Sequence, residues 1–290
     1  MKVWIVGKTG MLSKAFQRLF SGKGISYVAT AKEEVDICSL SRVKKQCKNK
    51  MVTHVINCSG FTAVDLAESH PEKAYALNCL GVKNLAIACA ESEKKLIHFS
   101  TDYIFDGTAH TPYTEEAVAQ PLSIYGKTKD DGEKELFHHL KESLLIRTSW
   151  LFGKEGNHFV KTVVDLVQKR DRLHIINDQK GRPTFCDDVV EATLHLIKQK
   201  GVFHFACAGQ VSWFEWAEEI LEQLKQAEIH SLCRELKPIP TSGYPTAAKR
   251  PLFSVLSTKK YETVTGEKPP CWKEGLRVCL KEIYVKHSCH

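Results

Sequence analysis

Short apolar runs alternate with amphipathic stretches along the first half of the chain. Five runs are rich in aliphatic residues and predict buried strands, over residues 3–7, 26–30, 54–58, 96–100 and 144–148. Between them, apolar residues at helical spacing predict helices over residues 11–20, 40–48, 71–92 and 123–140. Regular alternation of strands and helices is typical of a parallel sheet with helices on both faces. The pattern therefore predicts an α/β fold with a doubly wound parallel sheet.

The pattern loosens after about residue 155. We expect helices over residues 159–168, 189–198 and 213–226, a strand over 202–206, and a proline-rich connection over 237–245. This half predicts a smaller C-terminal α/β region. We therefore expect a domain over residues 1–155 and a second region over 156–290, parts of which return to the first domain.

Composition removes several classes of protein. The chain is 43% hydrophobic and 26% charged, as in ordinary globular proteins. Its net charge of +7 comes from 41 basic residues spread among 34 acidic ones, with no basic run longer than two. A protein that binds an anionic cofactor and an anionic substrate has the same balance. We expect no nucleic-acid partner.

Cysteine spacing and hydropathy add two further expectations. The eleven cysteines form no C-x-x-C motif, which argues against a metal site or a disulfide framework. The apolar stretch near the N-terminus is too short for a signal peptide, and no run approaches the roughly 18 apolar residues of a membrane span. We expect a cytoplasmic protein that makes no membrane contact.

A glycine turn joins the first predicted strand to the first predicted helix. Gly7 and Gly10 fit the spacing G-x-x-G-x-x-G, and Ser13 replaces the third glycine. Glycine allows the backbone to approach a pyrophosphate, which binds at the helix N-terminus. The turn predicts a Rossmann-type fold that binds a dinucleotide cofactor.

The end of the second predicted strand bears on which cofactor is bound. NAD-specific Rossmann proteins usually carry an acidic residue there, which binds the adenosine ribose. Here the strand ends at Ala29-Thr30, and Lys32 follows. Since no carboxylate would repel a 2′-phosphate, we expect NADPH to be preferred or both cofactors to be used. Asp36 lies further on, where it can contact the adenosine half.

Three residues predict a catalytic site. Thr101 lies at the end of the fourth predicted strand, where ligands bind in such folds. Tyr125 and Lys129 are four residues apart, one turn on the same helical face. The ammonium is expected to lower the pKa of the phenol, which then donates a proton to a developing alkoxide. Thr101 is expected to bind the carbonyl oxygen.

These motifs occur together in one family. The chain resembles the dTDP-4-dehydrorhamnose reductases, within the extended short-chain dehydrogenase/reductase superfamily. The matching segments are GKTGMLS (7–13), INCSGFTAVDLAES (56–69), FSTDYIFDG (99–107), YGKTKDDGE (125–133), RTSWLFG (147–153), NHFVKT (157–162), DQKGRPT (178–184), and Arg250-Pro251 with Ser254 and Leu256.

The resemblance implies NADPH-dependent, or NADH-dependent, reduction of dTDP-4-dehydro-L-rhamnose to dTDP-L-rhamnose, for a surface polysaccharide. It implies Thr101, Tyr125 and Lys129 as catalytic residues and Asp102, Tyr103, Trp150 and Arg250 as substrate contacts. The implied cofactor contacts are Gly7, Gly10, Met11, Leu12, Asp36, Ile37, Cys58, Ser59, Gly60 and Lys129. The stretch Cys58-Ser59-Gly60-Phe61 departs from the alanine-rich one usual in the family.

Two other functions stay open. A nucleotide-sugar epimerase or dehydratase of the same superfamily is the nearest, but dehydratases typically carry Thr-Asp-Glu where this chain has Tyr103 as the third residue. Some relatives instead serve as non-catalytic regulatory subunits of methionine adenosyltransferase.

Some family members use magnesium at a subunit contact. No motif in this chain assigns a metal, and a homodimer is possible.

Overall fold

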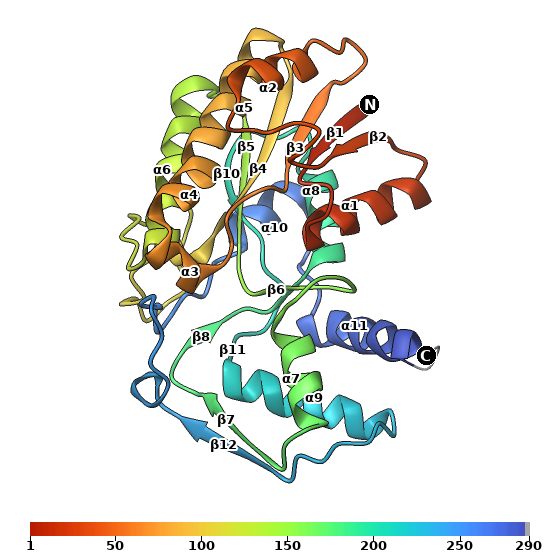
Figure 1. The fold of residues 1–290 in the computed structure, drawn as a ribbon, viewed down its shortest axis with the longest axis vertical. Coiled ribbons are helices and arrows are strands. Elements are labelled where there is room, and N and C mark those ends of the chain that lie inside the picture. Colours follow the sequence, from red (N-terminus) through yellow and green to blue (C-terminus); the bar gives the residue numbers. More distant parts are fainter. Residues whose placement is uncertain (288–290) are drawn as a thin grey trace.

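The computed structural model, which describes residues 1–287, is built around a six-stranded sheet (Figure 1). The strand order is β10-β5-β4-β3-β1-β2, and every neighbouring pair is parallel. This confirms the predicted Rossmann-type α/β class. The strands are β1 (Lys2–Val6), β2 (Ser26–Thr30), β3 (His54–Asn57), β4 (Lys95–Thr101), β5 (Leu144–Thr148) and β10 (Gly201–His204).

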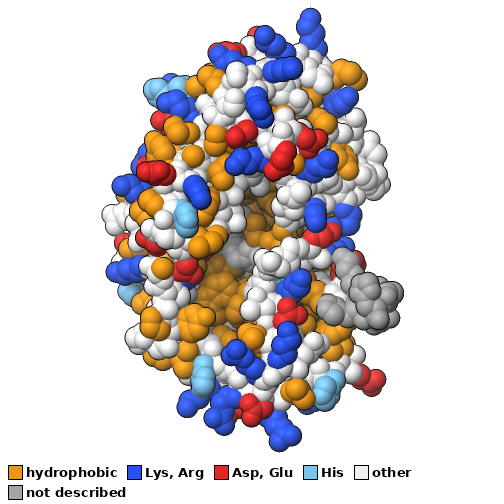
Figure 2. Space-filling view, viewed as in Figure 1, with side chains coloured by type: hydrophobic (Ala, Val, Ile, Leu, Met, Phe, Trp, Pro, Cys, Tyr) orange, Lys and Arg blue, Asp and Glu red, His pale blue; other side chains and the backbone are white. Residues whose placement is uncertain are grey.

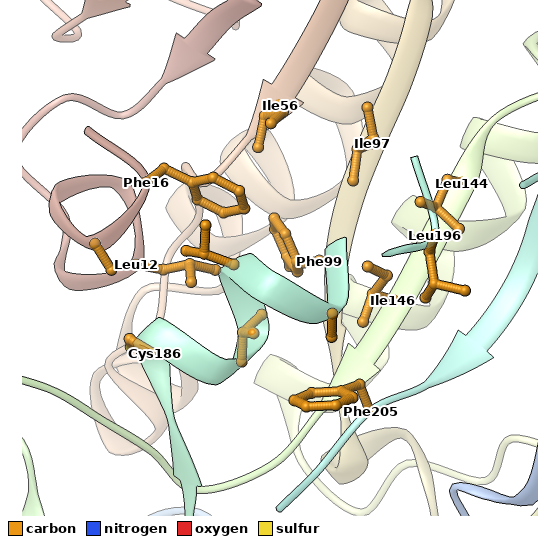
Figure 3. Close-up of a cluster of buried hydrophobic side chains, with 14 of the residues drawn as sticks. Leu12, Phe16, Ile56, Ile97, Phe99, Leu144, Ile146, Cys186, Leu196 and Phe205 are labelled. Carbon is orange, nitrogen blue, oxygen red and sulfur yellow. The ribbon is translucent and has the colours of Figure 1, made fainter. Parts of the chain in front are cut away.

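Helices cover both faces of the sheet, because its strands are apolar on both sides. On one face lie α1 (Met11–Gly22) and α8 (Cys186–His195). Figure 3 shows the buried cluster between these helices and the sheet, in which Phe16 of α1 and Phe99 of β4 approach to 5.8 Å between ring centroids. On the other face lie α2 (Leu40–Cys47), α5 (Gly81–Glu91) and α6 (Ile124–His139).

The helix predicted over residues 71–92 is interrupted by a π-helical turn. It consists of α4 (Pro71–Tyr75), the turn η1 (Ala76–Leu80) and α5. The turn presents the backbone of Asn78 to α6, where a Cβ on Gly132 would lie 2.0 Å from the Asn78 carbonyl oxygen. Gly132 is therefore required for this close approach. A short helix, α3 (Val64–Ser69), precedes the interrupted one and was not predicted.

Much of the second half forms the lower part of Figure 1 around its own buried cluster, which contains Trp216 and Trp272, whereas α8 and β10 lie with the large sheet. The helices predicted over 159–168, 189–198 and 213–226 are all present, with shifted ends at the first two. The elements outside the large sheet are β6 (Leu151–Phe152), α7 (Phe159–Val167), β7 (Arg172–Ile176), β8 (Lys180–Gly181), β9 (Thr184–Phe185), β11 (Val211–Ser212), α9 (Trp213–Gln226), β12 (Glu235–Ile239), α10 (Lys259–Thr265) and α11 (Trp272–His287), with the 3-10 turns η2 (Asp102–Ile104) and η3 (Thr241–Gly243).

One feature of this half differs from the prediction, and one predicted strand is present. The start of the connection predicted over 237–245 belongs to β12, which pairs in parallel with β7. The prediction was wrong there because the pairing partner, β7, is distant in sequence and was itself not predicted. The strand expected over 202–206 is β10, which joins the large sheet beside β5.

Two expectations from composition can be set against the structure. Within residues 1–287, no helix is both long enough and apolar enough to cross a membrane. The ten cysteines that the structure describes are free thiols, and Cys289 lies outside the described residues.

Candidate active site

A pocket of about 740 Å³ lies along the carboxyl ends of the central strands. It spans the point between β1 and β3 where the strand order reverses, the usual ligand position in doubly wound sheets. Figure 2 shows a hollow near the middle of the side of the molecule that it displays, with hydrophobic side chains inside the hollow. The second half of the chain also contributes to the lining, through Gly156, Asn157, His158 and Trp213.

The pocket brings together nearly all of the predicted site residues. All of the predicted catalytic and cofactor residues line it. Of the four predicted substrate contacts, Asp102, Tyr103 and Trp150 line the pocket, and Arg250 does not.

The glycine turn has the geometry that a pyrophosphate needs. Gly7 has a φ of +88°, and a Cβ there would lie 3.0 Å from the backbone nitrogen of Ser59. Gly10 is the N-cap of α1 and has no side chain to cap the helix. The first N–H groups of α1 therefore have no side-chain acceptor, and this end of the helix lines the pocket. Ser13 is fully buried, so serine is accommodated where a third glycine was expected. These residues fit a dinucleotide.

The segment after β2 brings a lysine to the pocket. The Thr30 hydroxyl accepts a hydrogen bond of 2.8 Å from the Trp4 indole and is buried. Glu34 accepts a bond of 2.7 Å from the Ala31 backbone nitrogen. Lys32 lines the pocket and is exposed. The sequence interpretation, which found no carboxylate at the strand end, did not consider Glu34.

The loop after β3 is held by two buried asparagines. The side-chain oxygen of Asn57 accepts the backbone N–H of Ser59 at 3.0 Å. Asn78, in the π-helical turn, binds both backbone groups of Phe61, at 2.8 and 3.0 Å, and donates to Thr128 of α6 at 3.1 Å. Sequence reasoning missed Asn78, whose signal was a lone amide on an otherwise apolar helical face.

Two side chains fix the start of α6 and thereby place Tyr125. Ser123 is the N-cap, and its hydroxyl accepts the backbone N–H of Gly126 at 3.2 Å. The carboxylate of Glu68 accepts the backbone N–H of Ile124 at 2.8 Å. The carboxylate also interacts favourably with the positive end of the helix dipole. Glu68 was not among the predicted site residues.

The electrostatics of Tyr125 differ from the prediction. Burial raises the pKa of Tyr125 to about 12, and the Asp102 carboxylate adds to this, while a hydrogen bond with Thr101 opposes it. The prediction that Lys129 lowers this pKa was therefore wrong. The reason is that the Lys129 ammonium donates instead to the backbone oxygen of Phe99, at 2.6 Å. Burial lowers the pKa of Lys129 to about 8.

Asp102 links the segment after β4 to the C-terminal part of the chain. Its carboxylate accepts hydrogen bonds from Ser254 at 2.5 Å and from Thr101 at 3.2 Å. Burial raises the pKa of Asp102 to about 7. Arg250 instead pairs with Asp65 of α3, with its two terminal nitrogens 2.6 and 3.0 Å from the carboxylate oxygens.

A stack of two tryptophan rings lines part of the pocket. Trp150 has a φ of +45° and stacks on Trp213 with ring centroids 3.7 Å apart. Gly181 makes room for this arrangement, because a Cβ there would lie 2.4 Å from the Trp150 ring. Gln179 accepts a hydrogen bond of 3.0 Å from the Trp213 indole. Sequence reasoning did not single out Trp213, since no local motif marks it.

Metal ligands do not gather in the described part of the chain. Within residues 1–287, no three His, Cys, Asp or Glu side chains are grouped so that they could hold a metal ion.

Comparison with known proteins places the chain in a family. The family model of the RmlD substrate binding domain matches residues 1–285. The dTDP-4-dehydrorhamnose reductase of Shigella flexneri is 34% identical, over 98% of this chain and 99% of its own length. The reductase structure from Clostridium acetobutylicum is 36% identical, with a TM-score of 0.92 over 98% of this chain and 100% of its own.

A further solved structure is the dTDP-4-dehydrorhamnose reductase of Bacillus anthracis in complex with NADP. It is 31% identical and has a TM-score of 0.91, over 97% of this chain and 99% of its own. The family model and these relatives span almost the whole chain, as the sequence resemblance predicted. The chain belongs to the dTDP-4-dehydrorhamnose reductase family.

Proposed function

We propose that this protein reduces the 4-keto group of dTDP-4-dehydro-L-rhamnose to give dTDP-L-rhamnose, with NADPH as the reductant. The observation that carries the proposal is the meeting of Thr101, Tyr125 and Lys129 in one pocket with the glycine turn. The named activity of relatives that match nearly the whole chain supports the choice of substrate.

The side chains divide the work of reduction. Bound at Gly7 and Gly10, the nicotinamide cofactor would supply the hydride. Since the pKa of Tyr125 is about 12, its phenol is protonated at neutral pH and can donate a proton to the developing alkoxide. Thr101 hydrogen-bonds the phenol and would bind the same substrate oxygen. In the overall reaction, the ketone, NADPH and one proton give the alcohol and NADP⁺.

The proposed preference for NADPH rests on Lys32. It lines the adenosine side of the pocket, where a cation favours a 2′-phosphate. The NADP complex of the Bacillus anthracis relative supports this choice. One carboxylate oxygen of Asp36 accepts a hydrogen bond of 2.9 Å from the backbone N–H of Cys38. In the proposed complex this carboxylate would contact the adenosine half.

The division of labour along the chain is part of the proposal. Residues 1–155 would bind the cofactor and 156–290 would mainly bind the substrate, with Trp150 and Trp213 against the nucleotide or the sugar. Cytoplasmic location, a homodimer and the lack of a nucleic-acid partner stay predictions.

NADPH oxidation with a panel of nucleotide-linked 4-ketosugars tests this function. We expect one NADPH oxidised per dTDP-4-dehydro-L-rhamnose consumed, measured at 340 nm and by product analysis. Product without net NADPH oxidation would instead indicate an epimerase or a dehydratase. No oxidation with any sugar, together with co-purification of methionine adenosyltransferase, would support the regulatory function.

A further inference from the structure

Three side chains lie four residues apart on α6: Tyr125, Lys129 and Glu133. Residues at this spacing occupy successive turns on one face of a helix. The first two line the pocket, whereas Glu133 is one turn further along and is not part of the lining. Lys129 and Glu133 are only 6% and 5% exposed, so both are largely withdrawn from water.

Arg147 of β5 holds the Glu133 carboxylate in place. Its Nε lies 3.1 and 3.2 Å from the two carboxylate oxygens, and its Nη2 lies 2.7 Å from one of them. The remaining nitrogen of the guanidinium donates to the Glu115 backbone oxygen at 3.2 Å and lies 3.3 Å from the His204 ring. Burial lowers the pKa of His204 to about 3, so its ring is neutral and accepts this bond. The bidentate geometry fixes the carboxylate.

The Lys129 ammonium has few partners of its own. Its hydrogen bond goes to the Phe99 backbone oxygen, at 2.6 Å. Besides Tyr125 and Glu133, His98 of β4 is a titratable group near it, and burial together with Lys129 holds the pKa of His98 far below its ordinary value, so that ring is neutral. Glu133 is the charged group that opposes the effect of burial on the pKa of Lys129.

A buried ammonium with one carbonyl acceptor loses much of its hydration, and a nearby carboxylate offsets that loss. We propose that Glu133, held by Arg147, is a positioning residue that keeps Lys129 charged beside Tyr125. The contribution of Lys129 to the reaction rests on the proposed function, but its charge state can be measured without any substrate.

The direct test is an NMR titration of the ligand-free protein with ¹³Cε-labelled lysine. The Lys129 resonance is identified by its loss in Lys129→Met, and it should titrate near pH 8, apart from the exposed lysines near pH 10. In Glu133→Gln the Lys129 midpoint should fall by about one pH unit. Glu133→Asp retains the charge and should restore the midpoint most of the way towards wild type.

Two further variants keep the outcome interpretable. Glu135→Gln makes the same chemical change two residues along α6, where the carboxylate pairs with Lys83 at 3.2 Å, and should leave the midpoint unchanged. If Glu133→Gln does not fold, the double variant Glu133→Gln/Arg147→Met removes both buried charges, and the midpoint should still fall.

The inference is overturned if the midpoint in Glu133→Gln, or in the double variant, equals that of the wild type. It is also overturned if Glu133→Asp moves the midpoint as far as Glu133→Gln does. A wild-type protein that oxidises no NADPH with any ketosugar would contradict the proposed function instead, and would leave this titration unaffected.

Discussion

The hydroxyl of Ser254 donates a hydrogen bond of 2.5 Å to the carboxylate of Asp102, across 152 positions of sequence. The bond connects the carboxyl end of β4, beside Thr101, to the C-terminal part of the chain. Asp102 is only 2% exposed, and burial raises its pKa to about 7 against an ordinary value of 3.8. A carboxylate with this environment carries its proton at mildly acid pH and loses it near neutrality.

The raised pKa of Asp102 predicts how stability depends on pH. A folded-state pKa above the unfolded value favours the folded state fully below pH 3.8, and this contribution is lost as the pH rises through about 7. The wild type should therefore lose stability from pH 5 to pH 8. Asp102→Asn keeps an acceptor for Ser254 but has no group that ionises, so its stability relative to wild type should rise over this interval. The gain should be on the order of 2–3 kcal/mol, measured by denaturant unfolding at both pH values.

Asp106→Asn is the matched control for this prediction. Hydrogen bonds from the Thr108 backbone and from the side chains of Tyr113 and Thr108 lower the pKa of Asp106. Its carboxylate therefore favours folding above its ordinary pKa, and its replacement should bring no gain as the pH rises. Equal pH profiles of wild type and Asp102→Asn would contradict the assignment of a raised pKa.

The contact between Gly132 and the π-helical turn predicts a large effect on stability. Gly132→Ala would place a methyl group 2.0 Å from the Asn78 backbone oxygen, so α6 or the turn must shift. We expect a loss of about 3 kcal/mol or more in the free energy of unfolding. Gly22→Ala, at a helical glycine with nothing within 4 Å of the added carbon, should change it by about 1 kcal/mol or less. Similar values for the two variants would rule out the close packing described here.

The position of Lys32 predicts cofactor selectivity. In Lys32→Ala the Kd for NADPH should rise about tenfold, because an ionic contact to the 2′-phosphate is lost, whereas the Kd for NADH should barely change. Nucleotide fluorescence gives both constants. Lys14→Ala removes an exposed lysine that does not line the pocket and should alter neither. Equal losses for both cofactors would exclude the 2′-phosphate contact.

The large sheet could be predicted because its strands are marked locally. β2 is one example: its apolar centre, residues 27–29, lies between a helix and a polar segment, and the strand has the predicted bounds of 26–30. β12 could not be predicted in this way, since its pairing with β7 depends on a partner some sixty positions earlier. The π-helical turn at Asn78 likewise depends on contacts with Phe61 and Thr128, which no periodicity shows.

The candidate site divides in the same manner. Gly7, Tyr125 and Lys129 belong to local motifs whose spacing already indicates their chemistry, and the structure brings them to one pocket. The pKa of Tyr125 was predicted in the wrong direction because burial, which depends on the whole fold, raises it, while Lys129 donates to the Phe99 backbone oxygen. Arg250 has its partner, Asp65, 185 positions away, so its ion pair could not be anticipated from the sequence.

Turnover of Tyr125→Phe on dTDP-4-dehydro-L-rhamnose tests the central claim most directly, since phenylalanine keeps the ring and removes the proton that is donated. The measurement is kcat by NADPH oxidation, together with the Kd for NADPH in the absence of sugar. We predict that kcat falls by a factor of about 100 or more while the Kd for NADPH stays largely unchanged. Turnover equal to that of wild type would contradict Tyr125 as the proton donor and, with it, the catalytic site proposed for this protein.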